Sequence, residues 1–285
     1  MKAAAFDYHA PVTLEAALDL LAEHAEDGRV LAGGQSLVPT MAFRMARPSN
    51  LIDINRIPGL DRVEADGTRL HIGALARHAR FEKPILPGPL GALLADVAHN
   101  IAHAPIRQRG TFCGSLAHAD PASEWCATAL ALGAQMTARR AGGERIIAAQ
   151  DWFRGIMATS LEPDEILVRV SLPMMSADWR CGFAEFARRA GDFALAMAVV
   201  ALRMDGARVA EARIALGGVG GTPVLAEDAA RLLLGHEPDA ALVHVVAEAA
   251  AAGCDPQDDL HADAEYRRDL VRAMVRRALS KAITS

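Results

Sequence analysis

The spacing of apolar positions alternates between helical and extended over the first fifty-odd residues. Residues 12–24 carry apolar side chains at helical spacing, with Thr13 as the candidate N-cap. Short apolar runs at residues 29–32 and 51–54 predict strands, and residues 37–45 between them predict a second helix. This order of helix, strand, turn, helix and strand predicts a compact α/β unit.

The following hundred residues predict short strands interleaved with two helices. The strands are expected at residues 62–65, 69–73, 135–138, 145–148 and 166–172. Asp66-Gly67 lies between the first two of them and predicts a hairpin. Helices are expected at residues 90–98 and 125–133, and the glycine- and proline-interrupted segment 99–123 between them is expected to be a long loop.

A small cluster of Pro173, Ser176 and Asp178, near residues 175–179, precedes a different pattern of extended runs followed by two helices. The extended runs are at residues 182–188, 194–204 and 207–216. We therefore expect a domain boundary at residue 176. Residues 1–176 form the first domain, with subdomains of about 1–57 and 58–176, and residues 177–285 form a smaller α+β domain.

The last expected helix, residues 265–282, gathers its apolar side chains on one side and carries basic residues elsewhere. The basic residues are Arg267, Arg268, Arg272, Arg276, Arg277 and Lys281. A solvated face explains them best, and a docking face for an acidic partner is the alternative.

Composition narrows the class of protein. The 285 residues are 52% hydrophobic and 23% charged, which is enough for a buried core. The formal charge of −5 offers no basic excess for nucleic acid. No apolar window is long enough to span a membrane, and the N-terminal run is broken too early for a secretory signal, so a cytoplasmic location is expected. The four cysteines form no CxxC pair, which argues against a metal or iron–sulfur site.

An apolar run stops at two adjacent glycines in the stretch VLAGGQSLVP, residues 30–39. Because Gly33 and Gly34 lack a Cβ, a strand leading into a helix here leaves several N–H groups open to a phosphate oxygen. The spacing is not GxGxxG, which disfavours a Rossmann dinucleotide site. Taken by itself, the stretch favours a plain turn over a phosphate site.

A second segment, IRQRGTFCGSLAHADPASE at residues 106–124, strengthens the phosphate interpretation. Gly110, Gly114 and Ser115 offer bare backbone and a hydroxyl. Asp120 and Glu124 are candidates to accept hydrogen bonds from a ribose or from backbone. Two such segments about 80 residues apart could hold one long ligand between subdomains, where pockets tend to form.

Several other residues have a chemical and a structural interpretation. Cys113 is a candidate redox thiol, but without a nearby second cysteine an inert small residue is favoured. His118 is favoured as a structural histidine over a catalytic one. His99 and His103 have the i, i+4 spacing of metal ligands, yet no third ligand is suitably spaced. The GGVGG stretch at residues 217–221 favours a tight strand exit or a subunit contact over a phosphate loop.

The motifs quoted above resemble a known family. VLAGGQSLVPTMAFRMARPSNLIDI and IRQRGTFCGSLAHADPASEW, with ARRAGDFALA (187–196) and IALGGVGGTPV (214–224), resemble the FAD-binding medium subunit of molybdenum hydroxylases. This is the family of carbon monoxide dehydrogenase and xanthine dehydrogenase. The resemblance implies an α+β, vanillyl-alcohol-oxidase-type (PCMH-type) FAD-binding fold of two α/β subdomains. A small C-terminal α+β domain with an antiparallel sheet, of the carbon monoxide dehydrogenase flavoprotein type, follows it.

The resemblance also implies which residues hold FAD. Glu124 matches an acid near the ribose or adenosine portion, and Leu161 and Phe193 match positions close to the flavin ring. The remaining expected cofactor-binding residues are Ala32, Gly33, Gly34, Gln35, Ser36, Leu37, Thr111, Phe112, Cys113, Gly114, Ser115, His118 and Asp120. Family members often have glycine and asparagine where this chain has Cys113 and Gln108, and a small shift of the second segment is expected.

By the same resemblance the chain is an oxidoreductase subunit that works by electron transfer and has no catalytic residue or metal ligand of its own. Electrons would arrive from 2Fe–2S clusters on a small subunit and leave to a quinone, NAD or oxygen. A large molybdopterin-containing subunit would oxidise the substrate, and the assembly would be a dimer of heterotrimers. A stand-alone FAD-dependent oxidase or reductase of the same fold is the alternative, and a flavin-free assembly scaffold is a third possibility. One branch of the family carries an extra four-cysteine cluster, against which the scattered cysteines argue.

Overall fold

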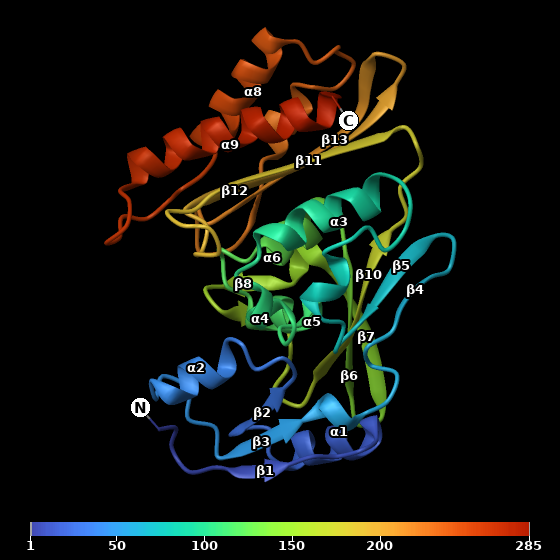
Figure 1. The fold of residues 1–285 in the computed structure, drawn as a ribbon, viewed down its shortest axis with the longest axis vertical. Coiled ribbons are helices and arrows are strands. Elements are labelled where there is room, and N and C mark those ends of the chain that lie inside the picture. Colours follow the sequence, from blue (N-terminus) through green and yellow to red (C-terminus); the bar gives the residue numbers. More distant parts are fainter. Residues whose placement is uncertain (1, 285) are drawn as a thin grey trace.

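The computed structural model describes residues 2–284, which form three main sheets stacked along the long axis of the molecule (Figure 1). The N-terminal sheet has three parallel strands in the order β1-β3-β2. Its elements are β1 (Asp7–His9), α1 (Leu14–Glu23), β2 (Gly28–Leu31), α2 (Leu37–Ala42) and β3 (Asn50–Asp53). As the sequence predicts, Thr13 caps α1, because its hydroxyl accepts a hydrogen bond from the Ala16 amide at 3.2 Å.

The middle sheet has five antiparallel strands in the order β4-β5-β10-β6-β7. They are β4 (Val63–Ala65), β5 (Arg69–Gly73), β6 (Gln135–Arg140), β7 (Gly143–Ala148) and β10 (Ile166–Pro173). The expected hairpin is confirmed, and Asp66 fixes its turn by accepting hydrogen bonds from the amides of Thr68 and Arg69 at 2.8 Å each. The pair β8 (Phe153–Gly155) and β9 (Ala158–Thr159) forms a small separate hairpin.

Helices and single turns connect the strands of this middle region. The helices are α3 (Pro89–Asn100), α4 (Ala104–Arg107), α5 (Phe112–His118) and α6 (Glu124–Ala131), and the 3-10 turns are η1 (Ile54–Arg56), η2 (His78–Phe81) and η3 (Ala149–Asp151). The long loop expected at residues 99–123 is therefore wrong in part, since α4 and α5 lie within it. The sequence pattern did not predict these helices, because Pro105 in the first turn of α4 and Gly114 within α5 are residues that usually indicate loops.

The C-terminal sheet is antiparallel in the order β11-β12-β13-β14. Its strands are β11 (Trp179–Phe186), β12 (Ala196–Asp205), β13 (Arg208–Gly217) and β14 (Val224–Leu225), and its helices are α7 (Glu227–Arg231), α8 (Ala240–Ala252) and α9 (Ala264–Thr284). In Figure 1, α8 and α9 lie above this sheet, and α3 and α6 lie below it. Among residues 2–284 no helix is long and apolar enough to cross a membrane.

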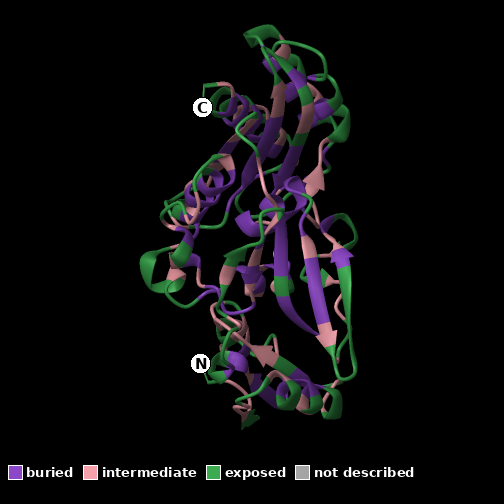
Figure 2. Cartoon of the chain, turned by 90° about the vertical axis from the view of Figure 1, so that its right-hand side faces the viewer, coloured by how far each residue is buried: buried purple, intermediate pink, exposed green. Residues whose placement is uncertain are grey.

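Both faces of the C-terminal sheet are buried, which joins it to the rest of the molecule. Alternate residues of β12 point to opposite faces. Met197 and Val199 belong to the core shared with the middle sheet, whereas Ala198 and Val200 belong to the core under α8 and α9. Figure 2 shows the resulting buried strands through the centre of the molecule and exposed turns at its periphery. The C-terminal sheet therefore completes the core of the region that precedes it.

A chain cut after residue 176 tests this shared core. The cut removes the sheet that covers α3 and α6, whose buried side chains would then face water. We expect the shortened chain to aggregate or to bind a dye that reports exposed apolar surface, because a large apolar patch is not tolerated in water. Size-exclusion chromatography and dye fluorescence measure this. A monomeric shortened chain that unfolds cooperatively would contradict it.

Candidate cofactor-binding site

The first glycine stretch forms the turn between β2 and α2 and presents a row of unpaired amides. Within the described part of the chain, none of the N–H groups of residues 33–37 donates a hydrogen bond to another residue. Gly34 has φ of +70°, in the left-handed region that favours glycine. Gln35 stiffens the turn from within, since its Nε2 donates to the Gly33 carbonyl at 3.1 Å. The turn thus leaves backbone donors free for an external acceptor.

The second segment is the start of α5 rather than a loop. Thr111 caps the helix, because its Oγ1 accepts a hydrogen bond from the Gly114 amide at 3.1 Å and its carbonyl accepts one from Ser115 at 3.1 Å. The Phe112 amide donates to the Ala76 carbonyl at 2.9 Å. Among residues 2–284 the Cys113 amide has no acceptor. This amide is the one backbone donor that the first turn of α5 leaves free.

The two segments lie in direct backbone contact. A Cβ added to Gly33 would lie 2.4 Å from the Arg109 carbonyl oxygen and 2.7 Å from the Gly110 Cα. On the far side of this contact, a Cβ on Gly110 would lie 2.6 Å from the His78 ring. Glycine at both positions therefore permits an approach that no other residue allows. The structure brings together the two sequence segments that we expected to share one ligand.

Cys113 points its side chain away from the contact between the two segments. Its side chain is buried, and Sγ lies 3.5 Å from the Ile72 carbonyl, on the core side of α5. Burial raises the pKa of the thiol, so Cys113 is inert as a nucleophile or redox group. Phe112 is also a core residue, stacked 4.6 Å from Trp125 between ring centroids. Both residues shape the segment through their side chains.

Sequence reasoning missed three residues that hold the two segments. Asn55 and Arg77 form hydrogen bonds to their carbonyl groups, and His78 packs against Gly110. His78 is neutral, because burial lowers its pKa to about 4 and its Nδ1 accepts a hydrogen bond from the Trp125 indole at 2.9 Å. Asn55 directly follows a predicted strand, which was a weak signal, whereas nothing in the sequence singled out Arg77.

A cavity of about 660 Å³ opens beyond the other end of α5. It is lined by Asp120 on one side and by Phe193, on the connection between β11 and β12, on the other. Phe193 is 69% exposed, unusually high for a large aromatic side chain. The expected strand exit at residues 217–221 forms a third wall, where the Gly218 amide donates to the Pro121 carbonyl at 2.9 Å. The cavity thus joins residues of both expected domains.

Arg267 forms the floor of this cavity, which corrects its assignment to a solvated basic face. Only 6% of the residue is exposed. Its guanidinium donates to the carbonyls of Leu195 and Gly218 at 2.8 and 2.9 Å and to Asp259 at 2.6 Å. Arg267 therefore ties together the two segments that flank Phe193. Helical periodicity predicted an exposed position for Arg267, because it assigns charged residues to the solvent face. The structure instead has Arg267 on the inner face of α9, where its guanidinium donates to buried carbonyl groups.

Two carboxyl groups, Glu124 buried and Glu185 half-buried, lie where α6 packs against the C-terminal sheet. Glu124, 8% exposed, begins α6, and Glu185 lies on β11. Burial raises the pKa of Glu124 to about 7, with a further contribution from Asp120. Burial, and then the charge of Glu124, raise the pKa of Glu185 to about 8. One Glu185 oxygen is buried without a hydrogen-bond partner in the structure. Near neutral pH Glu185 is therefore mostly protonated, whereas Glu124 is close to half protonated.

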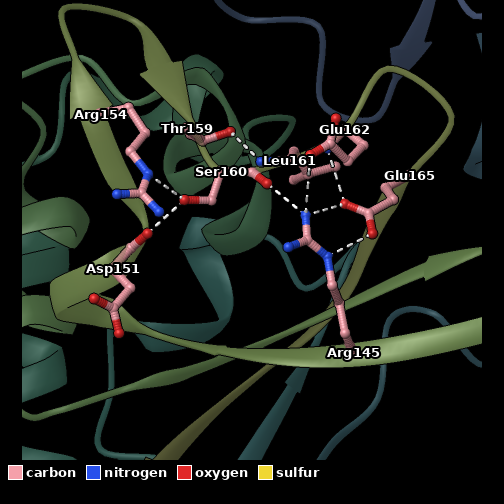
Figure 3. A network of polar contacts seen from close by, with 8 residues as sticks. All are labelled: Arg145, Asp151, Arg154, Thr159, Ser160, Leu161, Glu162 and Glu165. Carbon is pink, nitrogen blue, oxygen red and sulfur yellow. Dashed lines mark hydrogen bonds and ion pairs between the residues drawn. The ribbon is translucent and has the colours of Figure 1, made fainter.

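The turn that carries Leu161 is fixed by an arginine network (Figure 3). Arg145 binds both oxygens of the buried Glu165 carboxylate, at 2.7 and 2.8 Å, and donates to the Ser160 carbonyl at 2.6 Å. Although burial of Glu165 acts to raise its pKa, the Arg145 hydrogen bonds outweigh this and lower it. Glu165 in turn accepts a hydrogen bond from the Glu162 amide at 2.9 Å. Leu161 therefore sits on a rigid turn.

Most of the expected site residues fall into two groups separated by α5. Residues 32–37 and 111–115 lie on the two segments that meet at Gly33 and Arg109-Gly110, and Asp120 and Phe193 line the cavity beyond the end of α5. Glu124 and Leu161 do not line this cavity. The seven residues of α5 span about 10 Å, so only an extended ligand could reach both groups. His118 lies half-exposed in the last turn of α5, away from the first group. In residues 2–284 no cluster of His, Cys, Asp or Glu could hold a metal ion.

Comparison with known proteins agrees with this geometry. The family described as FAD binding domain in molybdopterin dehydrogenase matches residues 4–175, and the CO dehydrogenase flavoprotein C-terminal domain matches residues 182–282. The 6-hydroxypseudooxynicotine dehydrogenase complex subunit alpha of Paenarthrobacter nicotinovorans is 40% identical over 99% of this chain and 96% of its own length. The nicotine 6-hydroxylase medium subunit of the same organism is 39% identical over 99% of both chains.

A solved structure extends the likeness to three dimensions. Carbon monoxide dehydrogenase from Hydrogenophaga pseudoflava, in a form that lacks the Mo-pyranopterin moiety, superposes with a TM-score of 0.96 and 37% identity, covering 100% of this chain and 99% of that one. The chain therefore belongs to the family of FAD-binding medium subunits of molybdenum hydroxylases. It is an FAD-dependent oxidoreductase subunit, and the expected α+β, PCMH-type fold and FAD cofactor are confirmed.

The buried acids predict an unusual pH dependence of stability. Because the pKa values of Glu124 and Glu185 are raised in the folded chain, folding retains protons that the unfolded chain releases. Stability therefore falls as the pH rises from about 5 to about 8. We expect Glu185→Gln to increase the melting temperature at pH 8 by about 2 °C or more and to change it little at pH 5. The exposed Glu144→Gln is the control, and equal effects at both pH values would refute the assignment.

Proposed function

We propose that this chain is the electron-transfer subunit of a molybdenum hydroxylase, taking electrons from 2Fe–2S clusters of a partner and passing them to an external acceptor. The observation that carries the proposal is the contact between two bare backbone segments at the start of α5. Their unpaired amides, from residues 33–37 and Cys113, are the donors that a diphosphate requires. A quinone, NAD or oxygen is the acceptor class that the family resemblance implies.

The residues present fit FAD, and the proposal gives each a role. The first turn and the start of α5 would hold the diphosphate, and Glu124 would lie near the ribose or adenosine portion. Phe193 and Leu161 would lie near the flavin ring, at the cavity and on the Arg145-braced turn. Bound FAD supplies electron uptake and release that no side chain can provide. The chain's own part is to bind, orient and shield it.

Partners are the second part of the proposal. A large molybdopterin-containing subunit and a small 2Fe–2S subunit would complete the assembly, as a dimer of heterotrimers in the cytoplasm. Support comes from the relatives, whose names describe one subunit of a complex and one medium subunit. We keep the expected domain boundary at residue 176 within this proposal. A stand-alone FAD-dependent oxidase or reductase of the same fold stays the alternative.

Gly33→Ala tests the cofactor site. The added methyl group would lie 2.4 Å from the Arg109 carbonyl oxygen, so the two segments must move apart. The free amides of both segments could then no longer bind one diphosphate together. We expect FAD retained through purification to fall by about tenfold or more, measured from the flavin absorbance of acid-released cofactor. Gly143→Ala is the matched control, because a Cβ there meets nothing within 4 Å. Full flavin content in the Gly33 variant would count against the site.

Co-expression tests the partners. We expect a tagged chain, expressed with the genes that neighbour its own, to bring down one large and one small subunit in equal amounts. Electron transfer predicts that reduction of the isolated assembly by substrate also bleaches the flavin absorbance. A chain that purifies alone under these conditions, and whose flavin is reduced directly by a small substrate, would instead favour the stand-alone oxidase or reductase.

A further inference from the structure

We propose that Arg77 and Asn55 form a clamp that sets the spacing of the two backbone segments and so makes the site selective for ligands with a diphosphate group. The inference rests on the proposed function, because the two segments are the proposed diphosphate site. It adds two positioning residues that act through the backbone carbonyls of the segments, together with a specificity that follows from them.

Arg77 reaches the second segment. An isolated antiparallel bridge pairs Arg77 with Thr111, and it is flanked by hydrogen bonds from His78 to Gly110 at 3.0 Å and from Phe112 to Ala76 at 2.9 Å. This pairing delivers the Arg77 side chain to the Arg109 carbonyl, to which its Nη1 donates a hydrogen bond. The accepting carbonyl is the same one that lies against Gly33. Arg77 therefore acts at the contact point of the two segments.

Asn55 reaches the first segment and is bonded to Arg77. Its Nδ2 donates to the Ala32 carbonyl at 2.8 Å, and its Oδ1 accepts a hydrogen bond from Arg77 Nη2 at 2.5 Å. Asp53 holds Asn55 in place, because its Oδ1 accepts hydrogen bonds from the Asn55 amide at 2.9 Å and from Nδ2 at 2.5 Å. An unbroken series of hydrogen bonds thus runs from the Ala32 carbonyl through Asn55 and Arg77 to the Arg109 carbonyl.

The clamp crosses the junction between subdomains. Asn55 belongs to the region of the parallel sheet, and Arg77 belongs to the region of the middle sheet. The clamp restrains the Ala32 and Arg109 carbonyls, which belong to the same two segments as the unpaired amides. The guanidinium also stays charged, although burial and the neighbouring Arg109 lower its pKa. Its planar fork binds two acceptors at once, which a lysine ammonium cannot reproduce in the same geometry.

Selectivity follows from the fixed spacing. A ligand that contacts both segments, as a diphosphate would, depends on their separation, whereas the isoalloxazine and ribityl portion of a flavin depends on the cavity beyond α5. Loss of the clamp should therefore weaken ADP and FAD alike and leave riboflavin unaffected. A general loss of folding would weaken all three ligands, so the pattern across ligands separates positioning from stability.

The experiment uses the full chain after removal of its flavin, with FAD, ADP and riboflavin as probes in calorimetric titrations. We expect Arg77→Lys and Asn55→Ala each to raise the dissociation constants of FAD and ADP by about tenfold or more, as for loss of a hydrogen bond with a charged partner. The double variant should be no weaker than the worse single variant, because both residues act in one series of hydrogen bonds. Arg80→Lys, exposed on the same 3-10 turn η2, is the control and should bind all three ligands unchanged.

Unchanged FAD and ADP binding in both variants would overturn the clamp, and so would an equal loss of riboflavin binding or strictly additive effects. Asn55→Ala keeps the test decisive if Arg77→Lys fails to fold, because Asn55 is exposed and its side chain is short. If the unmodified chain bound neither FAD nor ADP, the proposed function would fail. If only the clamp proposal is wrong, the unmodified chain still binds FAD with normal affinity, and the variants bind it equally well.

Discussion

The proposed diphosphate site depends on the approach of two backbones at Gly33 and Arg109-Gly110. Side chains normally hold peptide backbones well apart, and a single added methyl group here would lie 2.4 Å from a carbonyl oxygen. The approach brings the backbone of the two expected subdomains into direct contact, with unpaired amides on the turn between β2 and α2 and at Cys113. Two glycines, one on either side of the contact, are the sequence requirement for the whole arrangement.

The C-terminal sheet also joins two parts of the molecule, because each of its faces packs against a different core. Its strand β12 is apolar along nearly its whole length, because one set of alternate residues faces α3 and α6 and the other faces α8 and α9. A sheet buried on both faces cannot slide without exposing one core. The connection that carries Phe193 leaves from this rigid sheet, and Arg267 fixes its base from α9. The cavity wall is thus anchored on both sides of Phe193, by the sheet and by Arg267.

Much of this architecture could be predicted from the sequence, and the exceptions share a cause. Strand and hairpin positions followed from periodicity, and the glycine segments followed from their bare backbone and from family resemblance. The roles of Arg77 and Asn55 could not be predicted, because both side chains bind backbone carbonyl groups. Every residue has such a carbonyl, so the type of the accepting residue gives no indication of the contact. Arg267 was misplaced because its partners, Leu195 and Gly218, are distant in sequence and also offer only carbonyls. Long-range side-chain to backbone hydrogen bonds are the interactions that periodicity cannot reveal.

The distribution of charge fits a subunit whose chemistry belongs to its cofactor. Of the charged groups near the two halves of the site, Arg77 and Arg267 donate to backbone carbonyls, and burial raises the pKa values of Glu124 and Glu185. A reactive side chain would need a partner poised to move a proton, and the buried thiol of Cys113 and the neutral His78 are both locked in the core. What the protein contributes is therefore fixed geometry. Because amides do not titrate and the carbonyls are held in their turns, the proposed diphosphate site would keep the same geometry while the redox state of a bound flavin changes.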